Sequence, residues 1–302
     1  MDKDLAGKVV VITGASSGFG KGAALEFARC GAMLALGARR DNLVEDIARE
    51  CEALGVRAVP VAIDVSIPND VEQLGRAALD EFGRLDVWVN NAGVGALGRF
   101  DAIPLDIHEQ VIRTDLLGTL YGSHFAFRRF VEQRHGVLIN IASELGQYTL
   151  PYYSSYSAAK HGVVGLSTAM RQELQQGDID DVHVCVVMPS AHDTPFFDHA
   201  ANYTGHEVQA PAPLHDPKEV VDAIVELARD PKNSKIVGGD GLVKIVLKKI
   251  APAAVDKMMG STMEKIQIEK APQAPPSPGA VEEPMLEGTE VSGGRGKGKS
   301  PL

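Results

Sequence analysis

Tyr156, Lys160 and Ser143 are the residues whose types and spacing could carry acid–base chemistry. Tyr156 and Lys160 stand four residues apart in a helical pattern, 156–175, so their side chains project from nearly one face. A tyrosine with its ordinary pKa near ~10 is a poor base at neutral pH, but a neighbouring ammonium lowers that pKa by stabilising the phenolate. Ser143 follows an apolar run, where its hydroxyl could donate a hydrogen bond to a substrate oxygen. The alternative is ordinary packing of the tyrosine, a solvated lysine and a serine that caps a strand end.

A glycine-rich segment, Thr-Gly-Ala-Ser-Ser-Gly-Phe-Gly at 13–20, lies between an apolar run and a helical pattern. Glycine lets the backbone turn sharply and brings N–H groups close to a phosphate. The N-terminus of the following helix adds a positive dipole end. The segment predicts a dinucleotide-binding turn, and a purely structural tight turn is the alternative.

The second apolar run ends in Gly37-Ala38-Arg39-Arg40. An acidic residue here would accept hydrogen bonds from the adenosine ribose 2′-hydroxyl of NAD. Ala38 leaves the place uncharged, and the two arginines offer cationic donors to a 2′-phosphate. The sequence therefore favours NADP (NADPH) over NAD, unless Arg39 and Arg40 are simply solvated at a helix start.

Apolar runs alternate with helical patterns over the first 190 residues and would position these motifs. The first run, 9–12, is continuous, which is typical of a strand buried on both faces. Such alternation predicts right-handed β-α-β units. We expect an α/β fold, a doubly wound parallel sheet with helices on both faces.

Thr13-Gly14-x-x-x-Gly18-x-Gly20, then Asn90-Asn91-Ala92-Gly93, then Ser143 with Tyr156-x-x-x-Lys160 follow one another along the chain. In this order and spacing they resemble the short-chain dehydrogenase/reductase family over about residues 7–240. The resemblance implies a Rossmann-type domain, NAD(P) binding and interconversion of a carbonyl and an alcohol. Tyr156 would then exchange the proton and the nicotinamide the hydride, while Ser143 polarises the carbonyl.

The resemblance also implies roles for further residues. Lys160 would hydrogen-bond the nicotinamide ribose, and Thr194 would contact the carboxamide. Asp64 and Val65 resemble the pair that contacts adenine, although an aspartate at a helix entry is the alternative for Asp64. The implied cofactor-binding residues are Gly14, Ser16, Ser17, Gly18, Phe19, Gly20, Arg39, Arg40, Asp64, Val65, Asn91, Ala92, Gly93, Tyr156, Lys160, Pro189 and Thr194.

Two positions depart from the family pattern. Asp115 stands where the family usually has asparagine, and Ser190 follows Pro189 where glycine is usual. The family's asparagine acts through its main-chain carbonyl, so that role could survive the change. A carboxylate at position 115 would, however, pair with Lys160 and partly cancel its effect on Tyr156. We therefore count Asp115 with Ser143, Tyr156 and Lys160 among the catalytic candidates and expect a less depressed pKa for Tyr156.

Composition limits the remaining possibilities. Hydrophobic residues make up 44% and charged residues 23% of the 302 residues, which excludes wholesale disorder, and the formal net charge of −10 argues against nucleic-acid binding. The three cysteines form no CxxC pair, and the histidines predict no metal site. There is no signal-peptide order at the N-terminus and no apolar run of about 18 residues. These features favour a cytoplasmic protein.

The C-terminal third differs from the rest because the last aromatic residue is Tyr203. We expect one catalytic domain over 1–240 and an amphipathic, Lys-rich helical extension over 241–270. The segment 271–302 contains six Pro and six Gly, a composition that predicts a disordered tail.

These observations predict an NADP(H)-dependent oxidoreductase acting on a small carbonyl or secondary alcohol. Phe196, Phe197 and Tyr203, in an expected lid, favour a hydrophobic substrate. The alternative is an NADP(H)-binding sensor or scaffold with little turnover. The family resemblance implies a homo-oligomer, and a weak membrane-surface contact through 241–270 is a further alternative to a solvated helix face.

Overall fold

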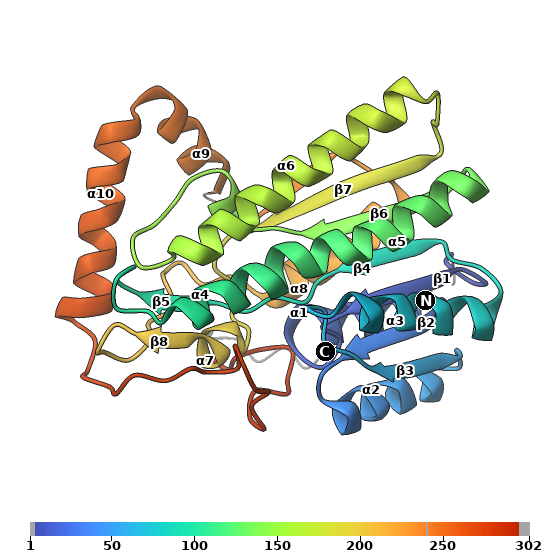
Figure 1. Ribbon diagram of the computed structural model, residues 1–302, viewed down its shortest axis with the longest axis horizontal. Coiled ribbons are helices and arrows are strands. Elements are labelled where there is room, and N and C mark those ends of the chain that lie inside the picture. Colours follow the sequence, from blue (N-terminus) through green and yellow to red (C-terminus); the bar gives the residue numbers. More distant parts are fainter. Residues whose placement is uncertain (1–3, 240, 296–302) are drawn as a thin grey trace.

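The computed structural model describes residues 4–239 and 241–295, and this part of the chain contains a seven-stranded parallel sheet (Figure 1). Its strand order is β3-β2-β1-β4-β6-β7-β9. The strands are β1 (Val9–Thr13), β2 (Met33–Ala38), β3 (Ala58–Ala62), β4 (Val87–Asn90), β6 (Gly136–Ile141), β7 (Val182–Pro189) and β9 (Ser234–Val237). The order reverses direction between β1 and β4, where doubly wound sheets form a ligand-binding crevice. The predicted α/β fold is confirmed.

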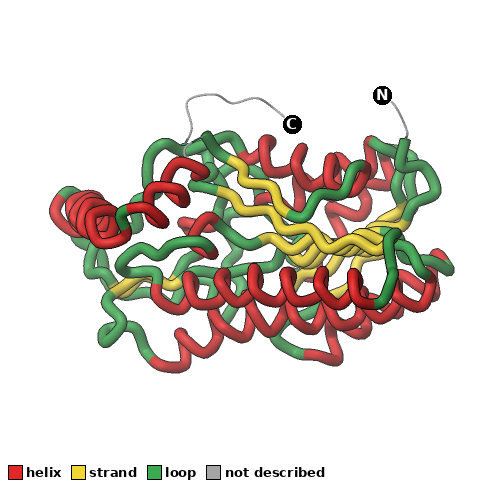
Figure 2. The backbone as a smooth tube through the Cα atoms, turned by 90° about the horizontal axis from the view of Figure 1, so that it is seen from above, coloured by secondary structure: helices red, strands yellow, loops and turns green. Residues whose placement is uncertain are grey.

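Helices cover both faces of this sheet, and Figure 2 shows the sheet between two helical layers. On one face of the sheet, the apolar sides of the helices pack against the side chains of Val10 and Ile12. On the other face, the helices pack against the side chains of Val9 and Val11. All four valine and isoleucine side chains are inaccessible to solvent, which explains why the first strand is continuously apolar. The first layer contains α1 (Gly18–Arg29), α2 (Asp41–Ala53) and α8 (Pro217–Arg229), and the second α3 (Pro68–Phe82), α5 (Gly118–Gln133) and α6 (Ser154–Gln176).

Polar contacts align β1 with β4. The Asp86 carboxylate, just before β4, accepts a hydrogen bond from the Val9 N–H at 2.9 Å. At the other end of β1, the Thr13 hydroxyl oxygen accepts hydrogen bonds from the N–H groups of Asn91 (3.1 Å) and Ala92 (3.2 Å). Both ends of the strand are therefore tied to the same neighbour.

One turn of π-helix, Arg113–Leu117, joins α4 (Leu105–Ile112) to α5. The π-turn contains one residue more than an α-helical turn, and such insertions occur frequently at functional sites. Asp115 lies in it and is completely buried.

A small lid covers the end of the sheet where the site lies. It consists of β5 (Ala96–Gly98) and β8 (Ala201–Tyr203), which pair in parallel, together with the short helix α7 (Phe196–His199). The expected lid residues Phe196, Phe197 and Tyr203 belong to it.

The C-terminal extension begins with two helices, α9 (Gly241–Ile250) and α10 (Pro252–Glu264), and a further π-turn, Lys265–Glu269. The structure then differs from the predicted disordered tail, because residues 271–295 lie against the domain in irregular conformation. Figure 1 shows this red segment passing from α10 along β8 and α7. Its backbone hydrogen bonds include Ser277 with Asn202, and Gly293 with Asp193. The remainder of the predicted tail, 296–302, lies outside the described residues. No described helix is long and apolar enough to cross a lipid bilayer.

Candidate active site

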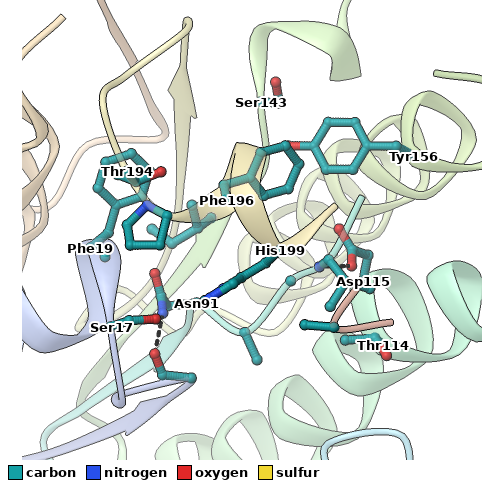
Figure 3. Close-up of a pocket in the computed structure, with 18 of the residues that line it drawn as sticks. Ser17, Phe19, Asn91, Thr114, Asp115, Ser143, Tyr156, Thr194, Phe196 and His199 are labelled. Carbon is teal, nitrogen blue, oxygen red and sulfur yellow. Dashed lines mark hydrogen bonds between the residues drawn. The ribbon is translucent and has the colours of Figure 1, made fainter. Parts of the chain in front are cut away.

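One pocket lies at the carboxyl ends of the central strands, and Figure 3 shows part of its lining. Loops that follow β1, β2, β4, β6 and β7 contribute to it because parallel strands end at the same edge of a sheet. Every residue predicted for the site lines the pocket except Gly20. The lining residues among them are Gly14, Ser16, Ser17, Gly18, Phe19, Arg39, Arg40, Asp64, Val65, Asn91, Ala92, Gly93, Asp115, Ser143, Tyr156, Lys160, Pro189 and Thr194.

Gly20 lies outside the pocket lining but packs directly against the backbone of the glycine turn at Gly14. A Cβ atom on Gly20 would lie 2.2 Å from the Gly14 carbonyl oxygen, so only glycine fits there. Gly14 and Gly18 have positive φ angles of 66° and 54°, which glycine adopts without strain. The Asn91 side-chain amide donates to the carbonyls of Thr13 (3.0 Å) and Gly14 (3.1 Å) and holds the turn from β4.

Tyr156, Lys160 and Asp115 meet at the other end of the pocket. The Lys160 Nζ lies 3.1 Å from the Asp115 Oδ2 and donates to the Ile141 carbonyl at 3.1 Å. It also lies 5.5 Å from the centroid of the Tyr156 ring. The other Asp115 oxygen accepts the Val94 N–H at 2.8 Å. The expected pairing of Asp115 with Lys160 is therefore present, in a place from which solvent is excluded.

The Tyr156 hydroxyl points into the pocket beside Phe196, whose ring centroid lies 5.3 Å from that of the tyrosine (Figure 3). Burial is the main cause that raises the pKa of Tyr156, and the Asp115 charge raises it further. A hydrogen bond with Ser143 has the opposite effect on this pKa. The Tyr156 hydroxyl therefore keeps its proton at neutral pH. The sequence predicted a lowered pKa for Tyr156, less depressed because of Asp115, and this direction is wrong: burial raises the pKa.

Ser143 stands two residues after the end of β6 and has contacts of its own. Its hydroxyl oxygen accepts the Leu145 N–H at 3.1 Å, and the hydroxyl donates weakly to the Pro189 carbonyl at 3.5 Å. The capping role considered for this serine is therefore real. It leaves the side chain buried in the pocket with Tyr156.

Replacing Asp115 by asparagine is expected to lower the pKa of Tyr156, because one of the negative charges that disfavour the phenolate is removed. With Tyr156 as the predicted proton donor in reduction, the alkaline limb of the kcat/KM profile should move to lower pH. Asp181→Asn, at a carboxylate whose side chain is 80% exposed, is the matched control and should leave the limb in place. An Asp115→Asn profile that coincides with the wild-type profile would refute the coupling.

The adenosine end of the predicted site is built around Arg39 and Arg40. Arg40 Nη2 donates to the hydroxyl oxygens of Ser16 and Ser17, each at 3.0 Å. Arg39 and Arg40 also donate to main-chain carbonyls in the C-terminal segment, including those of Glu282 and Met285. Sequence reasoning did not predict these last contacts.

Further pocket residues escaped prediction because they belong to no motif. Glu144 is buried beside Ser143, and its carboxylate lies 3.6 Å from Lys244 of α9. His192 packs edge-on against Phe19, with ring centroids 5.6 Å apart, and His199 joins the lining from α7. Ala280 and Pro284 of the C-terminal segment also line the pocket. Other lining residues that were not predicted include Ile63, Val94, Thr114, Leu145, Leu150, Tyr153, Pro195 and Pro211. Only the aromatic content of the lid pointed toward any of them.

The pocket fits a dinucleotide on its own features. The turn between β1 and α1 leaves no room for side chains at Gly14 and Gly20, as a backbone cradle for phosphate requires. Near Thr194, the buried Ser190 Oγ and His192 Nε2 atoms have no hydrogen-bond partner among the described residues. An amide-bearing ring would satisfy such atoms. Within the same described part of the chain, no group of His, Cys, Asp and Glu side chains could hold a metal ion.

Comparison with known proteins agrees with this geometry. An uncharacterized oxidoreductase of Bacillus subtilis, YxnA, is 30% identical over 275 residues, which cover 90% of this chain and 77% of that protein. An alcohol dehydrogenase from the archaeon Thermococcus sibiricus, solved in complex with 5-hydroxy-NADP, has a TM-score of 0.66 and 28% identity, with 76% of this chain and 95% of that chain covered.

A short-chain dehydrogenase/reductase from Burkholderia phymatum, solved with NAD, shares the fold with a TM-score of 0.74 at 24% identity, and 83% of this chain and 96% of that chain are covered. The model of the short chain dehydrogenase family matches residues 8–203. This match, together with the glycine turn, the partly buried Tyr156 and the buried Lys160, shows that the chain belongs to the short-chain dehydrogenase/reductase family of nucleotide-binding oxidoreductases.

Proposed function

We propose that this protein is an NADP(H)-dependent oxidoreductase that interconverts a hydrophobic carbonyl compound and its secondary alcohol. The observation that carries the proposal is the division of one pocket into two ends. Tyr156, Lys160 and Ser143 gather at one end, and Arg39 and Arg40 lie at the other. Cationic donors suit a 2′-phosphate, and a buried hydroxyl suits a carbonyl oxygen.

Tyr156 Oη holds the proton that the substrate oxygen receives in reduction. At neutral pH this hydroxyl is protonated, as a proton donor to the substrate oxygen must be. Ser143 Oγ donates a hydrogen bond to the same oxygen as negative charge develops there. Lys160 orients the nicotinamide ribose and offsets the Asp115 charge. When bound, the nicotinamide supplies the hydride in reduction or accepts it in oxidation.

The lining around Tyr156 supports an apolar substrate. Leu145, Leu150, Tyr153 and Phe196 surround this end of the pocket. Burying an apolar group here contributes about 25 cal/mol per Å². A substrate with an aliphatic or aromatic body beside its carbonyl fits such a lining better than a charged metabolite.

The direct test is oxidation of NADPH against a panel of ketones and aldehydes that range from polar to strongly apolar. We expect turnover with apolar members and little with charged ones. The buried Asp115–Lys160 pair favours a second candidate, an NADP(H) sensor with little turnover, because it opposes phenolate formation at Tyr156. Measurable NADPH binding without turnover of any panel member would favour the sensor.

Cofactor preference has its own test in Arg39→Ala. A charge-assisted hydrogen bond contributes roughly 1.5–3 kcal/mol, so the Kd for NADPH should rise relative to that for NADH by about 10–100-fold. The ratio of the two Kd values, measured by titration of cofactor fluorescence, is the readout. Arg49→Ala, at a 64% exposed arginine of α2, is the matched control. An unchanged ratio in Arg39→Ala would rule out the 2′-phosphate assignment.

The remaining expectations on assembly and location stay predictions. A homo-oligomer and a cytoplasmic location are proposed from the family. A weak membrane contact through α9 gains support from Val243 and Ile250, which are 58% and 75% exposed, and from the neighbouring Lys249.

A further inference from the structure

The segment 279–295, here called the strap, is anchored to the domain at several points. Val281 is completely buried in an apolar cluster with Val94 and Ile103. Farther along, Val291 is buried against α1, where its Cγ1 would lie 3.2 Å from a Cβ atom on Gly22. The strap ends at Arg295, whose side chain forms an ion pair with Asp198 of α7. Apolar burial at two places and a polar clasp at the end fix its course.

Between these anchors the strap takes up the hydrogen-bond donors of the predicted phosphate site. The Gly18 N–H, at the start of α1, donates to the Glu290 carbonyl at 2.9 Å. Arg39 donates to the carbonyls of Ala280, Val281 and Glu282, the last at 2.9 Å. Arg40 does the same with Met285 (3.2 Å) and Glu287 (3.3 Å).

These are the donors on which a phosphorylated nucleotide would depend. A main-chain N–H has a single hydrogen, so the Gly18 N–H cannot serve the Glu290 carbonyl and a pyrophosphate oxygen at full strength together. The strap offers both arginines hydrogen bonds to neutral main-chain carbonyls, and the Glu283 carboxylate adds an electrostatic attraction to Arg39 without a hydrogen bond of its own among those described. A phosphate offers them full negative charge, and charge-assisted hydrogen bonds are roughly twice as strong.

We propose that the strap is an internal competitor of the cofactor: its carbonyls occupy the adenosine-phosphate half of the site, and NADP(H) binds by displacing them. The inference rests on the proposed function, because it takes this pocket as the NADP(H) site. It adds a closed state in which the chain's own backbone stands in for the 2′-phosphate and the pyrophosphate. The hydrogen bonds between the strap and the side chains of Arg39 and Arg40 do not extend to the nicotinamide half of the pocket, which lies around Tyr156.

Competition of this kind has a quantitative consequence. The apparent Kd equals the intrinsic Kd divided by the fraction of molecules whose strap is open. A strap closed in about nine molecules of ten would weaken cofactor binding about tenfold. NADPH and NADH would be weakened by the same factor, since both need the strap to leave. Loosening the strap should therefore tighten both without changing the preference between them.

Single substitutions in the full chain test this inference. Val281→Asp places a carboxylate in an apolar cluster and should detach the first anchor, so the Kd values for NADPH and NADH should fall together, by about tenfold for the population above. Leu286→Asp introduces the same charge at a strap residue that is 87% exposed and should leave both Kd values unchanged. Arg295→Ala removes the ion pair with Asp198, keeps the main-chain hydrogen bond of Arg295 to Asp193, and by weakening this end of the strap should also tighten binding. It keeps the test valid if Val281→Asp fails to fold.

Binding, rather than turnover, is the readout because Val281 belongs to the cluster against which Tyr156 packs. NADPH affinity in Val281→Asp and Arg295→Ala that equals that of the wild type, or is weaker, would overturn the strap as a competitor. Failure of the cofactor assignment would look different, since no variant would then bind NADPH. NADPH binding without turnover would favour the sensor and would leave this test of the strap intact.

Amide hydrogen exchange gives an independent readout in the wild-type protein. The Ala280 N–H donates to the His199 carbonyl at 2.7 Å and the Gly293 N–H to the Asp193 carbonyl at 3.0 Å. Saturating NADPH should speed exchange along the strap by releasing it. Reduced nicotinamide mononucleotide lacks the adenosine half and should not. Equal or slower strap exchange with NADPH would contradict displacement.

Discussion

Tyr156→Phe is expected to lower kcat by about 10²–10⁴-fold, the usual contribution of a positioned general acid. The variant keeps the aromatic ring that packs beside Phe196 and loses only the hydroxyl that points into the pocket. Because the substituted atom lies at the catalytic end, away from Arg39 and Arg40, the Kd for NADPH should change little. Stopped-flow measurement of NADPH oxidation with saturating substrate separates the chemical step from binding.

Tyr153→Phe is the matched control for this prediction. Tyr153 is buried, lines the same pocket, and its hydroxyl has no hydrogen-bond partner among the described residues. Its ring centroid lies 6.3 Å from that of Tyr156. A loss of kcat in Tyr153→Phe as large as that in Tyr156→Phe would show that packing, and not proton transfer, is responsible. Substantial activity in Tyr156→Phe would lead to the same conclusion.

Lys160→Met is expected to cost about 3–5 kcal/mol in the free energy of unfolding. Removing one partner of a buried ion pair leaves the other charge without compensation. Asp115 is fully buried, and its remaining contact through Oδ1, the Val94 N–H, does not replace an ammonium 3.1 Å from Oδ2. Urea unfolding followed by circular dichroism measures the loss. The double variant Asp115→Asn/Lys160→Met should recover much of it, because no buried carboxylate remains.

The same pair predicts how this loss depends on pH. Burial raises the pKa of Asp115, and Lys160 is the main opposing influence, so the pKa rises further in Lys160→Met. The native state then holds a proton that the unfolded chain, with a carboxyl pKa near ~3.9, has already released. The contribution of Asp115 to stability in this variant should therefore be greatest below pH ~4 and fall as pH rises through the raised native pKa. The double variant lacks this slope, and equal slopes in the two variants would contradict the argument.

The fold and the catalytic end of the site could be predicted because their signals are local. The continuous apolar run at 9–12 reports burial on both faces, and the four-residue spacing of Tyr156 and Lys160 places both on one face of α6. The pairing of Asp115 with Lys160 was also predictable, from the family position of Asp115. The direction of the Tyr156 pKa shift was predicted wrongly, because the sequence does not report the burial of this side chain, and burial is the largest cause of the shift.

The strap could not be predicted, and its composition explains why. Pro and Gly suppress helices and strands, and a segment that forms neither a helix nor a strand is ordinarily disordered. The same property leaves its carbonyl oxygens unpaired within the segment and available to Arg39 and Arg40. Contacts between residues about 240 positions apart carry no periodic signal in one sequence.

The alignment of β1 with β4 also determines where the glycine turn lies in the folded chain. Side-chain alternation normally sets the register of a strand, because a slip of one residue would expose its apolar face. In β1 both faces are apolar and buried, so such a slip would expose nothing. Thr13, through its hydrogen bonds to the N–H groups of Asn91 and Ala92, must provide much of that alignment. The contact that fixes the register of β1 against β4 is thus also the one that places the glycine turn against Asn91.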